Sequence, residues 1–229
     1  MKKDSRSARR SIPSAVLGIV DRLSGRRHIE ARRGKLRDFL RLCRPAPGHS
    51  VLDVGVLGEE EYEAANFFLK EYPYPGSLTA LSIEDCGTLR SRYPLVRFVT
   101  YDGERFPFAD NSFDVCHSNA VVEHVGDCRR QQLFVSEMVR VARQGFFTTP
   151  NRWFPVELHT KIPFLHYLPW ATFLISCRLL GREDAIRGVR LLDRRQVKSL
   201  IKDTPVSRHR ILDNRFLGVT ATFSVYWRK

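Results

Sequence analysis

The run Ser50-Val-Leu-Asp-Val-Gly55 sets the pattern that the rest of the chain repeats. It follows the breaker cluster Pro45-Ala-Pro-Gly48 and stops at a glycine, which predicts a buried strand that ends in a turn. Apolar residues at helical spacing then predict a helix over 59–71, which Pro73 ends. Strand, turn and helix form the first unit of an alternating fold.

Similar units follow along the chain. Apolar runs predict further strands over 77–83, 96–101, 112–117 and 145–149, and helical spacing predicts helices around 133–141 and over 192–201. Two closing strands, 206–212 and 219–227, are joined by a short link that contains Asn214 and Gly218. We therefore predict an α/β fold with a doubly wound, mostly parallel, Rossmann-like sheet of seven strands and an antiparallel hairpin at its C-terminal edge.

Length and charge divide the chain into a body and a basic beginning. A chain of 229 residues with 43% hydrophobic content supports one core, which we assign to a domain over 45–229 with an acceptor-site insertion or lid over 151–190. Residues 1–44 form a predicted basic helical extension, with 14 Lys and Arg against four acids, or +10 of the net +13. This charge favours contact with phosphate, either of lipid headgroups or of nucleic acid, or else a solvated arm.

Targeting signals are weak. The apolar run 15–20 is too short for a secretory signal, and prolines and Arg178 interrupt the apolar stretch 162–180, so no transmembrane helix is predicted. Five scattered cysteines indicate free thiols in a reducing compartment. We predict a cytoplasmic protein with peripheral membrane contact through its basic start. Core packing explains equally well the stripe of apolar residues that share one helical face there, which are Ile12, Val16, Ile19, Val20 and Leu23.

Polar residues stand at the carboxyl ends of the predicted strands, the edge where sheets of this class bind ligands. They are Asp53 and Gly55 after the first strand, Glu84 after the second, Asp102 after the third, and Ser118 and Asn119 after the fourth. Such carboxylates suit ribose hydroxyls and an exocyclic amine. The GxGxxG fingerprint is absent, and acids at 59–61 would repel a pyrophosphate, so a nucleoside without phosphates is the expected ligand.

Four motifs follow one another along the chain: Val51-Leu-Asp-Val-Gly55, Asp102-Gly-Glu-Arg-Phe-Pro-Phe108, Asp110-Asn-Ser-Phe-Asp114 and Ser118-Asn-Ala-Val-Val-Glu-His124. Together they resemble the motifs of class I S-adenosylmethionine-dependent methyltransferases, and the third is similar to a block of the methyltransferase type 11 group. One departure is the missing central glycine of D-x-G-x-G-x-G in 53–59.

The resemblance implies S-adenosylmethionine as cofactor and assigns roles to individual residues. Asp53 and Gly55 would shape the methionine pocket, Glu84 would hold the ribose, Asp102 and Gly103 would bind adenine, and Ser118 and Asn119 would border the sulfonium.

Methyl transfer from a sulfonium is an in-line displacement that depends mainly on alignment, and a base helps when the acceptor is a hydroxyl. His124, which follows the fourth predicted strand together with Glu123, is the first candidate for that base. The other candidates are Glu123 and, in the insertion, His159, Glu157 and His166. Each histidine also has a purely structural interpretation. Glu123 and His124 alone are too few ligands to predict a metal site.

The acceptor is less defined than the cofactor. Aromatic residues in 151–190 favour a small-molecule acceptor that is hydrophobic or lipid-linked, with O-methylation preferred, or else form the core of a lid. The pI of about 10.0 and the arginine-rich start keep an RNA methyltransferase open. The missing glycine keeps open a non-catalytic module of the same fold, which calorimetry with S-adenosylmethionine would distinguish.

Overall fold

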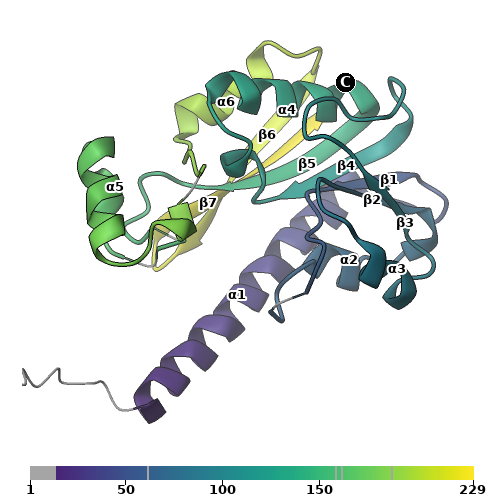
Figure 1. The fold of residues 1–229 in the computed structure, drawn as a ribbon. Coiled ribbons are helices and arrows are strands. Elements are labelled where there is room, and N and C mark those ends of the chain that lie inside the picture. Colours follow the sequence, from purple (N-terminus) through teal and green to yellow (C-terminus); the bar gives the residue numbers. More distant parts are fainter. Residues whose placement is uncertain (1–13, 61, 158, 161, 187) are drawn as a thin grey trace, which may run out of the picture.

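A mixed sheet of seven strands forms the centre of the molecule (Figure 1). The computed structural model describes residues 14–229 except 61, 158, 161 and 187. The strands are β1 (Val51–Val54), β2 (Leu78–Ser82), β3 (Arg97–Thr100), β4 (Phe113–Asn119), β5 (Ala142–Pro150), β6 (Arg208–Phe216) and β7 (Val219–Arg228). Their order is β3-β2-β1-β4-β5-β7-β6, and only the pairs that involve β7 are antiparallel. The predicted doubly wound sheet with an antiparallel C-terminal hairpin is confirmed.

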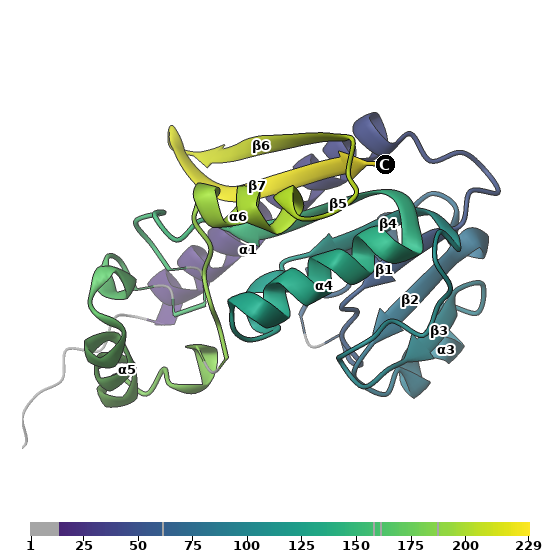
Figure 2. The same cartoon turned by 90° about the horizontal axis from the view of Figure 1, so that it is seen from above.

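Helices cover both faces of the sheet. They are α1 (Ser14–Cys43), α2 (Phe67–Glu71), α3 (Gly87–Arg92), α4 (Cys128–Val141), α5 (Trp170–Leu179) and α6 (Arg194–Lys202), with short 3-10 turns η1 (Pro75–Ser77), η2 (Val122–His124), η3 (Leu165–Tyr167) and η4 (Asp184–Ile186). Figures 1 and 2 show α4 and α6 together on one face, with α1 crossing the other. Helix α5 lies away from the sheet in the 151–190 insertion.

Two apolar layers result, one on each face. Leu52 and Val54 belong to the layer under α4 and α6, whereas Val51 belongs to the layer under α1 and α2. All four residues of β1 are buried, as expected for a central parallel strand covered on both sides. Side chains alternate between the faces along such a strand, so Asp53 shares the α1 face with Val51.

The end of α1 is part of this core. Phe39 and Cys43 are buried in the layer beneath the sheet, and the Gln144 side chain on β5 donates a hydrogen bond of 2.8 Å to the Cys43 carbonyl. The predicted membrane-facing stripe lies outside the described side chains. Among the residues that the structure describes, no helix is long and apolar enough to cross a membrane.

Three local predictions differ from the structure. The helix expected over 59–71 is helical only in α2, because Asn66 adopts a left-handed conformation and its side chain binds both the N–H and the carbonyl of Leu57. Asn214 lies within β6, and the hairpin turns instead at Leu217 and Gly218, whose φ angles of 48° and 82° fit a two-residue turn. Helix α5, which the proline-broken sequence concealed, begins directly after Pro169.

Candidate active site

The turn after β1 can be built only with glycine. Gly55 has φ of +88°, and a Cβ there would lie 2.3 Å from Cγ2 of Val121. The Gly55 N–H donates to the Leu81 carbonyl of β2 at 2.9 Å. The loop after β1 is thereby pressed against the segment that follows β4, two residues before Glu123.

The same loop touches the end of β2. The Gly58 N–H donates to Oε2 of Glu84 at 2.6 Å, and a Cβ on Gly58 would lie 2.5 Å from the Asp85 carbonyl oxygen. Glu84 thus faces the glycine loop, as the sequence predicted. Leu57 occupies the position at which the D-x-G-x-G-x-G motif has its central glycine, and this residue is 38% exposed.

Asp102 and Gly103 lie at the neighbouring strand end. Ser82 and Thr100 are register partners, so Glu84 and Asp102 each follow their paired strand by two residues. Thr100 Oγ1 donates to the Glu84 carbonyl at 3.5 Å, and Asp102 is exposed with Oδ1 accepting the Glu104 N–H at 2.9 Å. Both predicted nucleoside carboxylates therefore stand at one edge of the sheet.

Asp53 is placed differently from Glu84. Its Oδ1 lies 2.7 Å from Nδ1 of His117, and both side chains are buried on the α1 face, where the His117 ring stacks on Phe68 at 3.8 Å between centroids. Its carboxylate is therefore part of the sheet interior. In this position Asp53 supports the strand that carries Gly55.

Ser118 and Asn119 join neighbouring strands. The buried Ser118 hydroxyl donates to the Val54 carbonyl at 3.0 Å, and Oδ1 of Asn119 accepts from the Thr148 hydroxyl at 2.7 Å. Both residues lie where β4 meets the glycine loop and β5. The sequence predicts the sulfonium beside them, and the hydrogen bonds of both side chains are to the protein itself.

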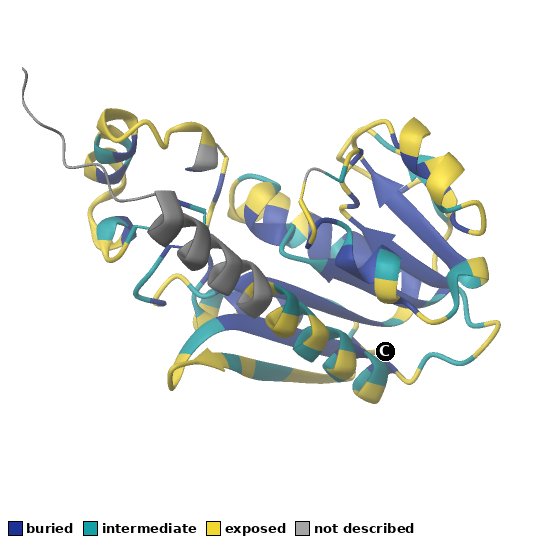
Figure 3. Ribbon diagram, turned by 90° about the horizontal axis from the view of Figure 1, so that it is seen from below, coloured by how far each residue is buried: buried dark blue, intermediate teal, exposed yellow. Residues whose placement is uncertain are grey.

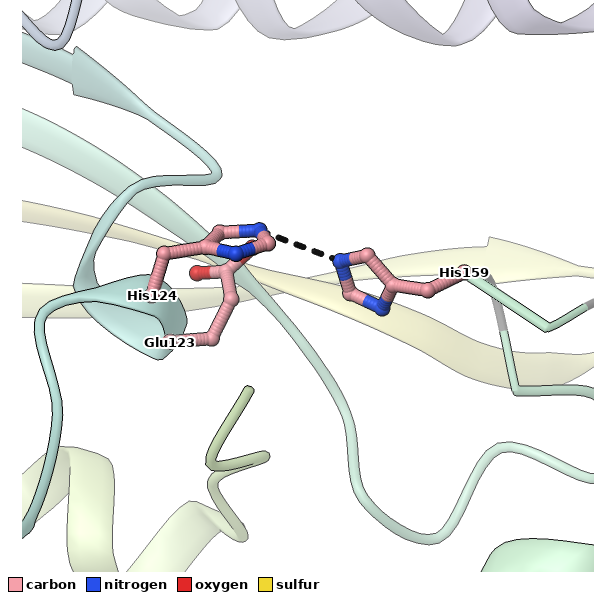
Figure 4. A group of neighbouring side chains, drawn as sticks. All are labelled: Glu123, His124 and His159. Atoms are coloured by element: carbon pink, nitrogen blue, oxygen red, sulfur yellow. Dashed lines mark hydrogen bonds between the residues drawn. The ribbon is translucent and has the colours of Figure 1, made fainter. Parts of the chain in front are cut away.

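Three predicted residues from two distant segments meet beyond β4 and β5 (Figure 4). Nε2 of His124 and Nε2 of His159 lie 3.1 Å apart, and a carboxylate oxygen of Glu123 lies within 4.8 Å of both. Glu123 and His124 come from η2, whereas His159 comes from the insertion. We call these three residues the Glu-His-His cluster.

Glu157 holds His159 in place. Its Oε1 lies 2.5 Å from Nδ1 of His159, and its carboxylate also accepts the backbone N–H groups of His159 and Thr160. The Glu157 side chain is 1% exposed. His166, the remaining candidate, lies elsewhere: its Nε2 bonds to the Arg152 carbonyl at 2.9 Å.

Burial and neighbours shift the titration of these groups. Burial raises the pKa of Glu123 to about 7, and burial together with the charge of His159 lowers the pKa of His124 to about 4. Burial alone would raise the pKa of Glu157, but bonds from His159 and from backbone N–H groups outweigh it and bring it to about 2. Burial opposes the imidazolium of His159, yet Glu157 raises its pKa. His124 is accordingly a neutral imidazole near neutral pH, with a lone pair available.

Comparison with known families matches residues 53–147 to the family described as a methyltransferase domain. These residues of the chain are similar to a methyltransferase domain. The match runs from the end of β1 into β5 and so includes the glycine loop, Glu84, Asp102 and the first two residues of the Glu-His-His cluster. His159 lies outside it.

Curated relatives of the methyltransferase domain come from mycobacteria. The chain is 38% identical over 109 residues to an uncharacterized methyltransferase of Mycobacterium avium, a match that covers 44% of this chain and 38% of that protein. A second, from Mycobacterium sp. strain JLS, is 39% identical over 104 residues, covering 43% of this chain and 36% of that protein. The chain thus spans under two-fifths of the length of the curated relatives it matches.

Solved structures share the fold at low identity. The S-adenosylmethionine dependent methyltransferase from Mesorhizobium loti has a TM-score of 0.53 at 13% identity, covering 83% of this chain and 95% of that one. N-methyltransferase NodS from Bradyrhizobium japonicum, in complex with S-adenosyl-L-homocysteine, has a TM-score of 0.51 at 13% identity, covering 89% and 85%. At such identities the likeness shows the fold alone.

The sequence alone did not reveal two neighbours of the cluster. The Thr149 hydroxyl at the end of β5 donates to Oε2 of the buried Glu123 at 3.1 Å. Lys35 of α1 lies near enough for its charge to act on Glu123, and burial lowers the pKa of this lysine to about 8. Thr149 could have been found from the run Thr148-Thr149 at the end of a predicted strand. Lys35 could not, because no spacing in the sequence connects α1 to η2.

Proposed function

We propose that this protein transfers a methyl group from S-adenosylmethionine to a hydroxyl oxygen of a small, apolar or lipid-linked acceptor. The observation that carries the cofactor half of the proposal is the contact of Gly58 with Glu84. It brings the glycine loop, which allows close approach of a ligand to the backbone, onto a carboxylate suited to ribose hydroxyls. Asp102 stands at the next strand end for the adenine.

The preference for oxygen rests on the chemistry beyond β4. A hydroxyl acceptor must lose a proton during transfer, and a neutral imidazole within reach of the reacting oxygen is the usual group to take it. His124 supplies the neutral imidazole, because burial and the charge of His159 lower its pKa to about 4. His124 follows Val121, which lies against Gly55, by three residues, and this supports a position near the expected methyl donor.

The apolar character of the acceptor is supported by the 151–190 insertion. Large side chains there stay exposed: Trp153 is 55% exposed, Phe164 60%, and Leu179 at the end of α5 82%. Figure 3 shows much of the segment around α5 coloured as exposed. The rings of Trp153 and Phe164 both contact the ring of Tyr167, which is itself 39% exposed. Exposed apolar side chains that gather in this way favour a surface that meets a lipid, a hydrophobic ligand or another protein. These exposed side chains and the charge of +10 over residues 1–44 support the peripheral membrane contact that is part of this proposal.

The experiment is transfer of a labelled methyl group to fractionated cell extract. Wild-type protein and labelled S-adenosylmethionine are incubated with lipid, small-polar and RNA fractions, and each product is located by mass spectrometry. We expect label in a lipid or apolar fraction that base hydrolysis of esters does not release, as for an ether. Label confined to RNA would support the alternative RNA methyltransferase, and no transfer with no cofactor binding would support a non-catalytic module.

A further inference from the structure

We propose that the Glu-His-His cluster binds a divalent transition-metal ion. The ligand atoms are a Glu123 carboxylate oxygen and the Nε2 atoms of His124 and His159, which lie within 4.8 Å of one another. Two histidines and one carboxylate are a ligand set that zinc and related first-row dications accept. The site joins η2 to the insertion, so it links the methyltransferase domain to the segment expected to receive the acceptor.

The spacing of the two imidazoles fits a shared ion. Two nitrogens at about 2.1 Å from one ion lie about 3.0 Å apart in octahedral geometry and about 3.4 Å apart in tetrahedral geometry. The observed separation of Nε2 atoms on His124 and His159 is 3.1 Å. Figure 4 shows these two nitrogens facing each other across the dashed line.

Glu123 supplies an independent indication that something is held here. Its side chain is fully buried, Oε2 accepts the Thr149 hydroxyl, and Oε1 has no hydrogen-bond partner among the described residues. A buried carboxylate oxygen without a partner is costly unless a cation or donor satisfies it. A cation between Glu123 and the histidines would remove that cost.

Glu157 prepares His159 for the same role. Because Glu157 accepts from Nδ1 of His159, the proton of the neutral ring sits on Nδ1 and the lone pair sits on Nε2, which faces His124. Metal-binding histidines commonly donate their other ring N–H to a carboxylate in this way, and loss of that partner typically costs 10- to 100-fold in metal affinity. Glu157 is thus a positioning residue.

The exposure of the cluster indicates an open coordination sphere. Glu123 is buried, His159 is half-buried and His124 is exposed, so the ion would have three protein ligands and free positions on the His124 side. Catalytic sites keep such positions for water or substrate, whereas structural zinc sites close them with a fourth protein ligand.

A role in the reaction follows if the proposed methyl transfer is correct. The acceptor hydroxyl would occupy an open position and lose its proton to water, since coordination lowers its pKa. The oxygen then forms the bond to the methyl carbon, and the carbon–sulfur electron pair leaves with the sulfur as the neutral thioether. With an ion bound, His124 would be a ligand and water would accept the proton, so the ion would replace His124 in the role of base that the proposed function gives it.

The test measures metal binding by the full chain, without any turnover. Chelator-treated protein is titrated with Zn²⁺ by calorimetry and with Co²⁺ by visible absorption, which reports nitrogen ligation. Wild type should bind one ion per chain, and His124→Ala and His159→Ala should each weaken binding at least tenfold. Glu157→Gln should weaken it by about 10- to 100-fold. His209→Ala, an exposed histidine of β6, is the matched control and should bind like wild type.

Other outcomes decide against the site. Equal affinity of wild type and His124→Ala, or no binding at 100 µM metal while circular dichroism shows folded protein, would leave only a hydrogen-bonded histidine pair and overturn the proposal. Mg²⁺ is titrated in the same way and should bind more weakly than Zn²⁺ or Co²⁺, because it prefers oxygen ligands. Calorimetry with S-adenosylmethionine is performed on the same samples, so that failure of the metal site and failure of the proposed methyl transfer are told apart.

Discussion

Replacing Gly55 by alanine tests how tightly the cofactor loop is joined to the candidate acceptor site. The variant meets two costs: a positive φ, which disfavours a side chain by about 1–2 kcal/mol, and a Cβ placed 2.3 Å from Val121, an overpacking that typically costs about 1–3 kcal/mol. We expect Gly55→Ala to lose about 2–5 kcal/mol of unfolding free energy.

Gly48 offers a matched control. Its φ is +87° against +88° at Gly55, but nothing lies within 4 Å of a Cβ built there. Gly48→Ala should therefore lose only the part of the unfolding free energy that comes from the positive φ, about 1–2 kcal/mol. The double variant Gly55→Ala/Val121→Ala should recover part of the difference, because the second change removes the atoms that clash.

Urea unfolding followed by circular dichroism measures these three variants and Val121→Ala alone, and an unchanged slope of the transition indicates a common folded state. If Gly55→Ala is no less stable than Gly48→Ala, or if Val121→Ala adds its own cost in full to the double variant, then the loop and η2 are not in the close contact that the structure shows.

Further predictions concern buried polar pairs on each face of the sheet. Asp53→Ala should lower the unfolding free energy by about 1–3 kcal/mol, because it leaves the buried His117 Nδ1 without its partner; additivity with His117→Ala in a double-variant cycle would contradict the pairing. Glu137 accepts the Phe106 N–H and the Arg140 guanidinium, and these bonds outweigh burial and hold its pKa below the ordinary 4.5. A depressed carboxyl stabilises the fold above its unfolded pKa, so the deficit of Glu137→Gln in urea titrations should be largest above pH 4.5 and shrink as pH falls through the lower folded-state pKa; a deficit independent of pH would refute this.

The sheet was predictable because apolar runs and breakers mark its strands directly. β1 is the short apolar run Val51-Leu-Asp-Val54 between a proline cluster and Gly55, and a run of this length between breakers favours a strand over a helix. The structure buries all four of its residues, as expected for a central strand. The helix over 59–71 was wrong over most of its length because Asn66 binds Leu57 through its side chain, a local bond that competes with the helix and that periodicity does not record.

The candidate site was predictable in its residues and less so in its contacts. Glu84 faces the glycine loop as expected from parallel strand ends, but Asp53 points to the α1 face because side chains alternate along a strand. His159 was named from its residue type alone. Its approach to His124 depends on the path of the insertion after β5, which no spacing in the sequence determines.

Calorimetric titration with S-adenosylmethionine tests most directly whether the tips of β2 and β3 and the glycine loop form one cofactor cleft. We expect saturable binding to wild type, about fivefold to tenfold weaker for Glu84→Ala and for Asp102→Ala, since each removes a solvent-screened hydrogen-bonding carboxylate. Asp203→Ala, an exposed acid at the end of α6, should bind like wild type. No binding to wild type, or unchanged affinity in both strand-tip variants, would contradict the cleft.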